Sequence, residues 1–298
     1  MENLNYHHLR YFWAVARAEN LTRAAADLHL TPQTVSTQIK DLEQSLGKSL
    51  FRRSGRRLVL TEVGQVVYRY ADEIFSIGKE LVEMLAGQPV GRTLRLVVGV
   101  ADVLPKLIAH RLIEPATNLK ERVRVVCRET GLQSLLADLA MHRVDVVLSD
   151  APIPPSTKIR AFNHLLGECG VTFMASSHLA RRYRSRFPRS LDGAPVLLPT
   201  EDTALRGQLD RWFQARGIRP EIVGEFEDSA LLETFGQAGA GLFPVPSIIE
   251  EEAGRQYRAK PVGRADGVVE RFFAISVERK VEHPAVAAIC TAARTELF

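Results

Sequence analysis

A short polar segment between Thr31 and Lys40 holds the residues best suited to recognise another molecule. The pair Thr31-Pro32 predicts a helix start, because a hydroxyl caps free helix amides and proline favours the first helical position. Val35 and Ile39 would face inward on that helix. The outward side chains would then be Gln33, Thr34, Ser36 and Thr37. Glutamine can pair bidentately with adenine and hydroxyls can bond several bases, so this face suits the DNA major groove; the alternative is an ordinary solvated face.

Two helices are expected before this segment, at residues 4–17 and 22–29, with Thr22 as the N-cap of the second. Leu30 lies in the tight connection between the second helix and the polar helix. The apolar residues that would pack between the three helices are Leu9, Phe12, Trp13, Ala16, Ala24, Ala25, Leu28, Val35, Ile39, Leu42 and Leu46. Two short helices joined by a tight turn indicate a helix-turn-helix.

Residues 48–60 predict a β-hairpin, with apolar Leu50 and Phe51 entering it and Leu58 and Leu60 leaving it on alternate positions. The segment is basic and contains no acidic residue. Its predicted contacts with the DNA backbone are Arg52, Arg53, Arg56 and Arg57, together with Thr31 and Lys40 of the preceding helix. A charged run is usually only solvated, but a basic wing behind a helix-turn-helix is placed to contact phosphates or the minor groove. Residues 1–60 are therefore expected to form a winged helix-turn-helix domain.

A long helix is predicted at residues 61–86, with Thr61 as its N-cap. Its apolar residues alternate at spacings of four and three, which is a heptad pattern, at Val63, Val67, Tyr70, Ile74, Ile77, Leu81 and Met84. Such a seam favours pairing with a second copy of the helix, and the alternative is packing against its own chain. A dimer would double the number of base pairs that are read.

The net charge of +4 is concentrated at one end of the chain. Residues 1–60 contain nine Lys or Arg and five Asp or Glu, whereas the remainder contains thirty of each. This asymmetry favours an amino-terminal nucleic-acid contact. The sequence has no run of 18 apolar residues and no recognisable leader, so a cytoplasmic protein without membrane contact is expected. The three cysteines lie too far apart for a metal knuckle and are interpreted as buried thiols.

Residues 87–92 are rich in Gly and Pro and predict a hinge. Beyond it, apolar strands alternate with helices, which predicts an α/β fold with a parallel sheet covered on both faces. Two lobes joined by short crossovers are expected, the first from residues 93–162 and 266–298 and the second from residues 163–265.

Ligands of two-lobed α/β proteins bind between the lobes, beyond the carboxyl ends of the strands. The residues expected there are Ala101, Asp102, Glu129, Thr130, Asp150, Thr200, Glu201 and Asp202. Helix starts at this position favour anions such as small carboxylates. The five acidic residues could instead hold a hard cation, or could act only as helix caps. No specific set of metal ligands is predicted.

Two other classes of protein share a cleft between α/β lobes. An enzyme is disfavoured because the sequence has no GxSxG, GxGxxG, Walker or HExxH motif. A periplasmic solute-binding protein is disfavoured by the basic wing and the missing leader. No cofactor is predicted.

The amino-terminal motifs in combination resemble those of the LysR-type transcriptional regulators. They are LTRAAA at 21–26, STQIKDLE at 36–43, LG at 46–47, LFRR at 50–53 and LTEVG at 60–64. The resemblance extends over the whole chain. It implies a winged helix-turn-helix, a linker helix and a periplasmic-binding-protein-like effector domain. It also implies a dimer of dimers that binds operator DNA, senses a small effector by lobe closure, and acts on RNA polymerase.

Within the family, YFW at 11–13, LTPQTV at 30–35 and VYRYAD at 67–72 resemble the branch that activates sodium/proton antiporter genes. That likeness implies an activator whose effector is Na⁺ or Li⁺, and the alternative is a regulator of a metabolic operon that senses a small organic acid. Many family members begin the recognition helix with Gln-Pro and place Arg after its serine. Here the order is Pro32-Gln33 and Thr37 follows Ser36, so a relative's base code cannot be transferred.

Overall fold

The computed structural model describes residues 4–54, 57–85, 93–277 and 283–298. It divides into two compact units, Met1–Arg92 and Thr93–Phe298, each with its own core. The hinge predicted at 87–92 lies outside the described residues. No helix among the described ranges is long and apolar enough to cross a membrane.

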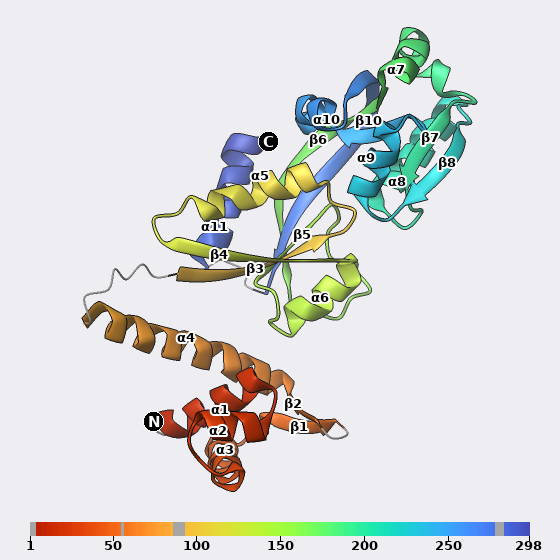
Figure 1. Ribbon diagram of the computed structural model, residues 1–298. Coiled ribbons are helices and arrows are strands. Elements are labelled where there is room, and N and C mark those ends of the chain that lie inside the picture. The colour runs from red at the N-terminus through yellow and green to blue at the C-terminus, as the bar shows by residue number, and fades with distance from the viewer. Residues whose placement is uncertain (1–3, 55–56, 86–92, 278–282) are drawn as a thin grey trace. The chain divides into compact units, whose positions relative to one another are not determined.

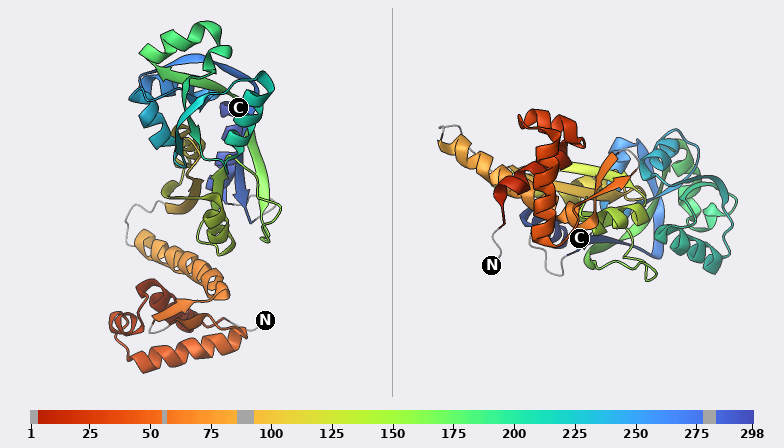
Figure 2. Two further views of the ribbon diagram at one scale, coloured as in Figure 1. Left: turned by 90° about the vertical axis from the view of Figure 1, so that its right-hand side faces the viewer. Right: turned by 90° about the horizontal axis from the view of Figure 1, so that it is seen from below.

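The amino-terminal unit packs three helices against a hairpin and the first half of a long fourth helix (Figures 1 and 2). Its elements are α1 (Tyr6–Ala18), α2 (Leu21–Asp27), α3 (Pro32–Leu46), β1 (Phe51–Ser54), β2 (Arg57–Leu60) and α4 (Glu62–Leu85). The core consists of Leu9, Phe12, Val15, Ala24, Ala25, Val35, Ile39, Leu42, Leu50 and Ala71. Leu46 was expected inward, but it is 38% exposed because α3 ends there at a left-handed Gly47.

Helix caps explain where these helices begin. The Thr31 hydroxyl accepts a hydrogen bond from the Thr34 amide, and the Thr61 hydroxyl accepts one from the Gly64 amide, which confirms both predicted caps. The predicted cap at Thr22 is wrong. Asn20 caps α2 instead, because its side-chain oxygen accepts from the Arg23 amide at 3.0 Å, and the helix therefore begins at Leu21.

The carboxyl-terminal unit is an α/β structure. Its strands are β3 (Thr93–Ala101), β4 (Arg122–Thr130), β5 (Val146–Ser149), β6 (Phe162–Ser176), β7 (Pro195–Pro199), β8 (Glu221–Phe226), β9 (Phe243–Pro246) and β10 (Ala259–Ser276). Its α-helices are α5 (Lys106–Thr117), α6 (Leu132–Ala140), α7 (Ser177–Tyr183), α8 (Ala204–Arg216), α9 (Ser229–Gln237), α10 (Glu250–Gln256) and α11 (Pro284–Ala292).

The main sheet has the strand order β4-β3-β5-β10-β6-β9, with β7 and β8 forming a separate pair. The pairs β3–β4, β3–β5 and β7–β8 are parallel. However, β10 runs antiparallel to both β5 and β6, so the expectation of a wholly parallel sheet is wrong. The two lobes are joined by the long strands β6 and β10 (Figure 1) and not by short crossovers. Strand β10 alternates buried with exposed or half-buried residues along much of its length, and the first half of β6 is mostly exposed or half-buried, so neither strand is a continuous apolar run over its full extent.

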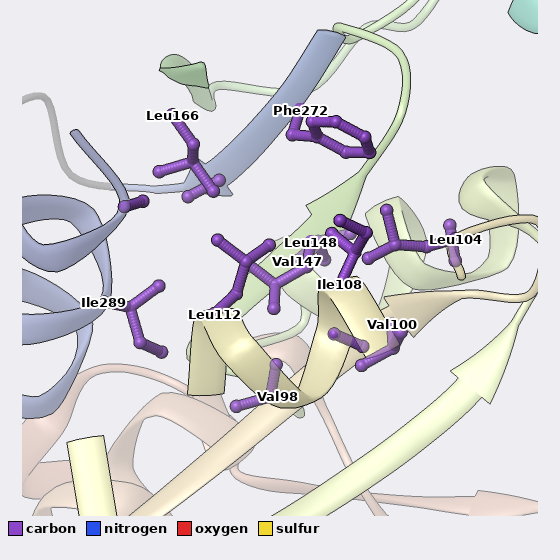
Figure 3. Packing of buried hydrophobic residues seen from close by; sticks show 14 of the residues in the cluster. Val98, Val100, Leu104, Ile108, Leu112, Val147, Leu148, Leu166, Phe272 and Ile289 are labelled. Atoms are coloured by element: carbon purple, nitrogen blue, oxygen red, sulfur yellow. The ribbon is translucent and has the colours of Figure 1, made fainter. Parts of the chain in front are cut away.

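Two apolar clusters stabilise this unit. In the larger cluster, Ile108 and Leu112 of α5 and Ile289 of α11 meet Val98 and Leu148 of the sheet (Figure 3). The second cluster surrounds Phe173 of β6 and includes Leu198, Leu209, Trp212 and Phe213. The larger cluster also contains Met174, Phe243 and Ala259 of the second lobe, so it continues across both lobes, whereas the cluster around Phe173 is confined to the second lobe.

Candidate functional site

The polar face of α3 is exposed in the amino-terminal unit. Gln33, Thr34, Thr37 and Lys40 are exposed and Ser36 is half-buried, whereas Val35 and Ile39 lie in the core. The helix therefore presents its predicted base-facing residues on the side opposite the core. An exposed polar face backed by a close-packed apolar face is the geometry that a recognition helix needs to enter a major groove.

Some of these hydroxyls are already used within the helix. The Thr37 hydroxyl donates to the Gln33 carbonyl at 3.0 Å, and the Thr31 and Thr34 hydroxyls lie 2.8 Å apart. These bonds orient the hydroxyl groups, and all three threonines remain exposed to solvent. Gln33 has the longest reach of the uncharged residues on this face, which makes it the strongest candidate for reading a base edge.

The basic hairpin pairs Phe51 with Leu60 and Arg53 with Leu58 in antiparallel register. Arg52 and Arg53 are exposed. Arg56 lies outside the described residues, and only the backbone of Arg57 is described, as the partner of Ser54.

Glu43 anchors the hairpin to α3, a role that the sequence did not reveal. Its Oε1 accepts hydrogen bonds from the Leu50 amide at 2.6 Å and the Phe51 amide at 3.0 Å. A carboxylate that accepts two amides from the start of the strand fixes the wing relative to the recognition helix. These two hydrogen bonds therefore hold the residues predicted to face the bases and those predicted to face the phosphates in a fixed relation.

The predicted seam on α4 divides between two environments. Val67 and Ile74 pack against the core of their own unit, beside the buried Ala71. Val63, Tyr70, Ile77 and Leu81 are exposed, by 39%, 58%, 53% and 52% respectively. Met84 belongs to the helix, but its side chain lies outside the described residues. The second half of α4 also exposes Val82 and Leu85.

Trp13 holds the first half of α4 in place. Its indole Nε1 donates to Asp72 Oδ1 at 2.8 Å, and its ring packs against Phe75. The start of α4 is therefore part of the winged domain, and the exposed apolar row extends beyond it.

The predicted cleft residues lie at the expected ends of β3, β4, β5 and β7, in differing environments. Ala101 and Asp150 are buried, Asp102 and Thr200 are half-buried, and Glu129, Thr130, Glu201 and Asp202 are exposed. Burial raises the pKa of Asp150 to about 6, and the negative charges of Asp102 and Asp202 add to that rise. These three carboxylates are therefore close enough to interact.

Basic side chains already neutralise part of this acidic group. Lys106 Nζ forms ion pairs with Glu129 and with Asp228, the latter at 3.0 Å, and it also donates to the Asp102 carbonyl at 3.2 Å. The Arg206 guanidinium is 3.9 Å from Glu201. Within the described ranges, no three His, Cys, Asp or Glu side chains are arranged to hold a metal ion.

A pocket lies beside this cluster, with walls from both lobes. Val103 and Pro105 come from the first lobe, Phe226 and Leu232 come from the second, and Glu270 comes from the connecting strand β10. Arg206 helps to shape it, because this buried guanidinium donates to the Pro199 carbonyl at 3.0 Å and also binds Asp210 and Glu225.

Two buried carboxyl groups line the pocket, Glu233 and Glu270, which are 3% and 4% exposed. Neither carboxyl group was among the residues predicted from the sequence. For Glu270 a signal existed, since it occupies the inward position between Val268 and Phe272 in the alternation of β10. Burial raises the pKa of Glu270 to about 8 and that of Glu233 to about 7, although a hydrogen bond from Tyr257 favours the charged form of Glu233.

Glu270 should make the carboxyl-terminal unit less stable as pH rises. Its folded pKa lies above its unfolded value, so the folded state binds the extra proton; the stabilisation is complete below about pH 4.5 and is lost as pH rises through about 8. The slope from this group cannot exceed about 1.4 kcal/mol per pH unit. Urea unfolding of the full chain between pH 5 and 9 should show this decline, and Glu270→Gln should flatten it. An identical slope in both proteins would contradict the assignment.

Comparisons with known proteins bear directly on this architecture. Residues 6–65 match the family model of bacterial regulatory helix-turn-helix proteins of the lysR family, and residues 90–297 match that of the LysR substrate binding domain. The chain belongs to the LysR family of transcriptional regulators. The family resemblance and the fold class inferred from the sequence are thereby confirmed.

One similar LysR relative is the transcriptional activator protein NhaR of Escherichia coli K12, which is 35% identical over 298 residues, covering 100% of this chain and 98% of the relative. Solved LysR structures share the fold. CbnR in complex with its target DNA aligns with a TM-score of 0.54 and 20% identity over 97% of this chain and 98% of that chain. HinK from Pseudomonas aeruginosa aligns with a TM-score of 0.56 and 18% identity over 99% of both chains.

Proposed function

We propose that this LysR regulator reads operator DNA by inserting α3 into the major groove while its wing contacts the phosphate backbone. The observation that carries the proposal is the exposed polar face of α3, which is fixed to a basic hairpin by the hydrogen bonds that the Leu50 and Phe51 amides donate to Glu43. Gln33, Ser36 and Thr37 supply base contacts, and Arg52 and Arg53 supply phosphate contacts. The assignment of Arg56 or Arg57 to the wing tip stays a prediction.

The regulator acts as an activator that contacts RNA polymerase in the cytoplasm, where the operator DNA lies. Support for activation comes from the full-length similarity to a relative named as a transcriptional activator. Activation requires the operator complex to respond to a signal, which the carboxyl-terminal unit supplies. A small effector in the pocket between its lobes would favour one degree of lobe closure and change the bend of the bound DNA.

The dimer forms when α4 pairs with α4 of a second copy of the chain. Val63, Tyr70, Ile77 and Leu81 are exposed apolar residues at heptad positions, and pairing two such rows would remove them from water. Two recognition helices would then bind two half-sites on the same operator. Two such dimers joined through their carboxyl-terminal units would make the tetramer.

Na⁺ or Li⁺ as the effector is the hypothesis that follows from the acidic cluster. Its support is the proximity of Asp102, Asp150 and Asp202, whose carboxylates interact. Against it, Lys106 already pairs with Glu129 in this region. A small organic acid, the alternative from the sequence, would have to bind beside these same negative charges.

Two sets of variants test the DNA-binding face. Gln33→Ala should relax selectivity at one base position, because the binding free energy that separates the preferred base from the other bases there should fall by about 1–3 kcal/mol. Arg52→Ala with Arg53→Ala should weaken binding to all sequences and lower the slope of log affinity against log salt by about two. Fluorescence anisotropy with operator and scrambled duplexes at several salt concentrations measures both effects. If the wing variant retained the wild-type salt slope, the phosphate assignment would be wrong.

A further inference from the structure

We propose that the pocket between the lobes binds a small organic ammonium ion, with Glu270 accepting hydrogen bonds from its N–H groups. This inference deepens the proposed function, because it assigns a chemical class to the effector. It depends on Glu270 and Glu233, which were not predicted from the sequence, and on the apolar walls around them.

The first observation is an unpartnered oxygen. Glu270 is 4% exposed and lines the pocket, and its Oε2 has no hydrogen-bond partner among the described residues. A buried carboxyl oxygen without a donor costs free energy, and a ligand that brings an N–H group would recover it. The pocket therefore has room for a ligand that donates a hydrogen bond to Glu270 Oε2.

The second observation is the charge around that atom. The charged groups that interact with Glu270 are the carboxyls of Asp150 and Glu233, and Glu227 also lines the pocket. The Cys169 thiol on the paired strand β6 interacts with Glu270 as well and adds no positive charge. The nearby Lys106 is engaged by Glu129 and Asp228. Burial together with these charges raises the pKa of Glu270 to about 8, so an arriving cation would favour its charged form. An anionic ligand would instead add to the repulsion.

The third observation is the composition of the walls, which favours an organic cation over a bare metal ion. Eight of the twelve lining residues are apolar, and four of the eight are prolines, whose fixed backbones make the walls rigid. Phe226 adds an aromatic ring that can contact a cation. Hard metal ions need several oxygen ligands directed at one point, and no three acidic side chains of the described residues are arranged in that way. Alkyl groups on the ammonium ion would pack against the apolar walls.

Thermal unfolding of the full-length protein at pH 8 tests this assignment. The probes are methyl-, ethyl- and butylammonium chloride, compared at equal ionic strength with sodium, lithium and tetramethylammonium chloride and with sodium acetate. At least one alkylammonium should raise the unfolding temperature by several degrees at concentrations well above its Kd. Tetramethylammonium should not, because it has no N–H group.

Variants locate the response. Glu270→Gln should weaken the alkylammonium Kd, measured by calorimetry, at least tenfold. Glu251→Gln removes an exposed carboxylate and is the matched control that should respond like the wild type. The inference is overturned by a wild type that responds to none of the alkylammonium ions, by an equal response in Glu270→Gln, or by a response confined to sodium and lithium or to acetate. These wild-type results stand even where a variant fails to fold, and operator binding of the wild type, measured separately, decides the proposed function.

Discussion

Replacing Ile77 and Leu81 with aspartate should convert the regulator into a monomer that binds its operator at least about a hundredfold more weakly. Both side chains are about half exposed on the apolar row of α4, so the charges would be buried only when two copies pair. A monomer reads one half-site, so it loses the base contacts of the second half-site. It also loses the gain in affinity that comes from linking two recognition helices in one molecule. Sedimentation velocity and an operator titration on the same sample measure both effects.

Two controls separate dimerisation from folding. Ser76→Asp adds a charge to the same helix at an exposed polar position outside the heptad row, and it should leave both the mass and the affinity unchanged. Ile74→Asp should instead unfold the amino-terminal unit, because Ile74 packs against the core of its own chain. If the double variant remained a dimer with wild-type operator affinity, α4 would not be the dimer interface.

Gly64→Ala should destabilise the amino-terminal unit by about 3 kcal/mol, the upper range for an overpacked core. A Cβ atom at this position would lie 2.0 Å from the Leu50 carbonyl oxygen, which is backbone and cannot move without shifting the wing. The same displacement would disturb the amides that Glu43 binds, so operator affinity should also fall. Hydrogen exchange of peptides from α1 and α3 in the full chain measures the loss of stability.

The same helix offers a matched control. Gly78→Ala places a Cβ in open space, with no heavy atom from outside its own helical turn among the described residues within 4 Å, and should stabilise the helix by about 0.5–1 kcal/mol because alanine is the better helix former. The free energy of unfolding should therefore fall in Gly64→Ala and rise in Gly78→Ala. Equal protection of the α1 and α3 peptides in Gly64→Ala and the wild type would contradict the claim that the Leu50 carbonyl leaves no room for a Cβ atom at position 64.

Local patterns made much of the winged domain predictable. The Thr31 and Thr61 caps, the inward Val35 and Ile39, and the β1–β2 hairpin follow from rules that act within a few residues. The cap of α2 was predicted two residues late, because Asn20 and Thr22 are both good caps and their spacing cannot decide between them.

Long-range contacts account for what the sequence did not reveal. The heptad pattern of α4 does not distinguish Ile74, which packs against its own α1–α3 core, from the exposed Ile77. Asp102 and Glu129 could be placed at strand ends, but the pairing of Glu129 with Lys106 joins residues 23 positions apart. Glu270 and Glu233 come from distant segments that only the tertiary fold brings to one pocket.

A hydroxyl-radical footprint of the wild-type protein on DNA upstream of its own gene would show whether two copies of α3 read one operator. We expect two protected segments on the same face of the duplex, separated by whole helical turns and related by a two-fold axis. Their protection should weaken steeply with added salt, as phosphate contacts require. A single protected half-site would contradict the dimer, and a wild type that protects no sequence over scrambled DNA would contradict the reading of operator DNA by α3.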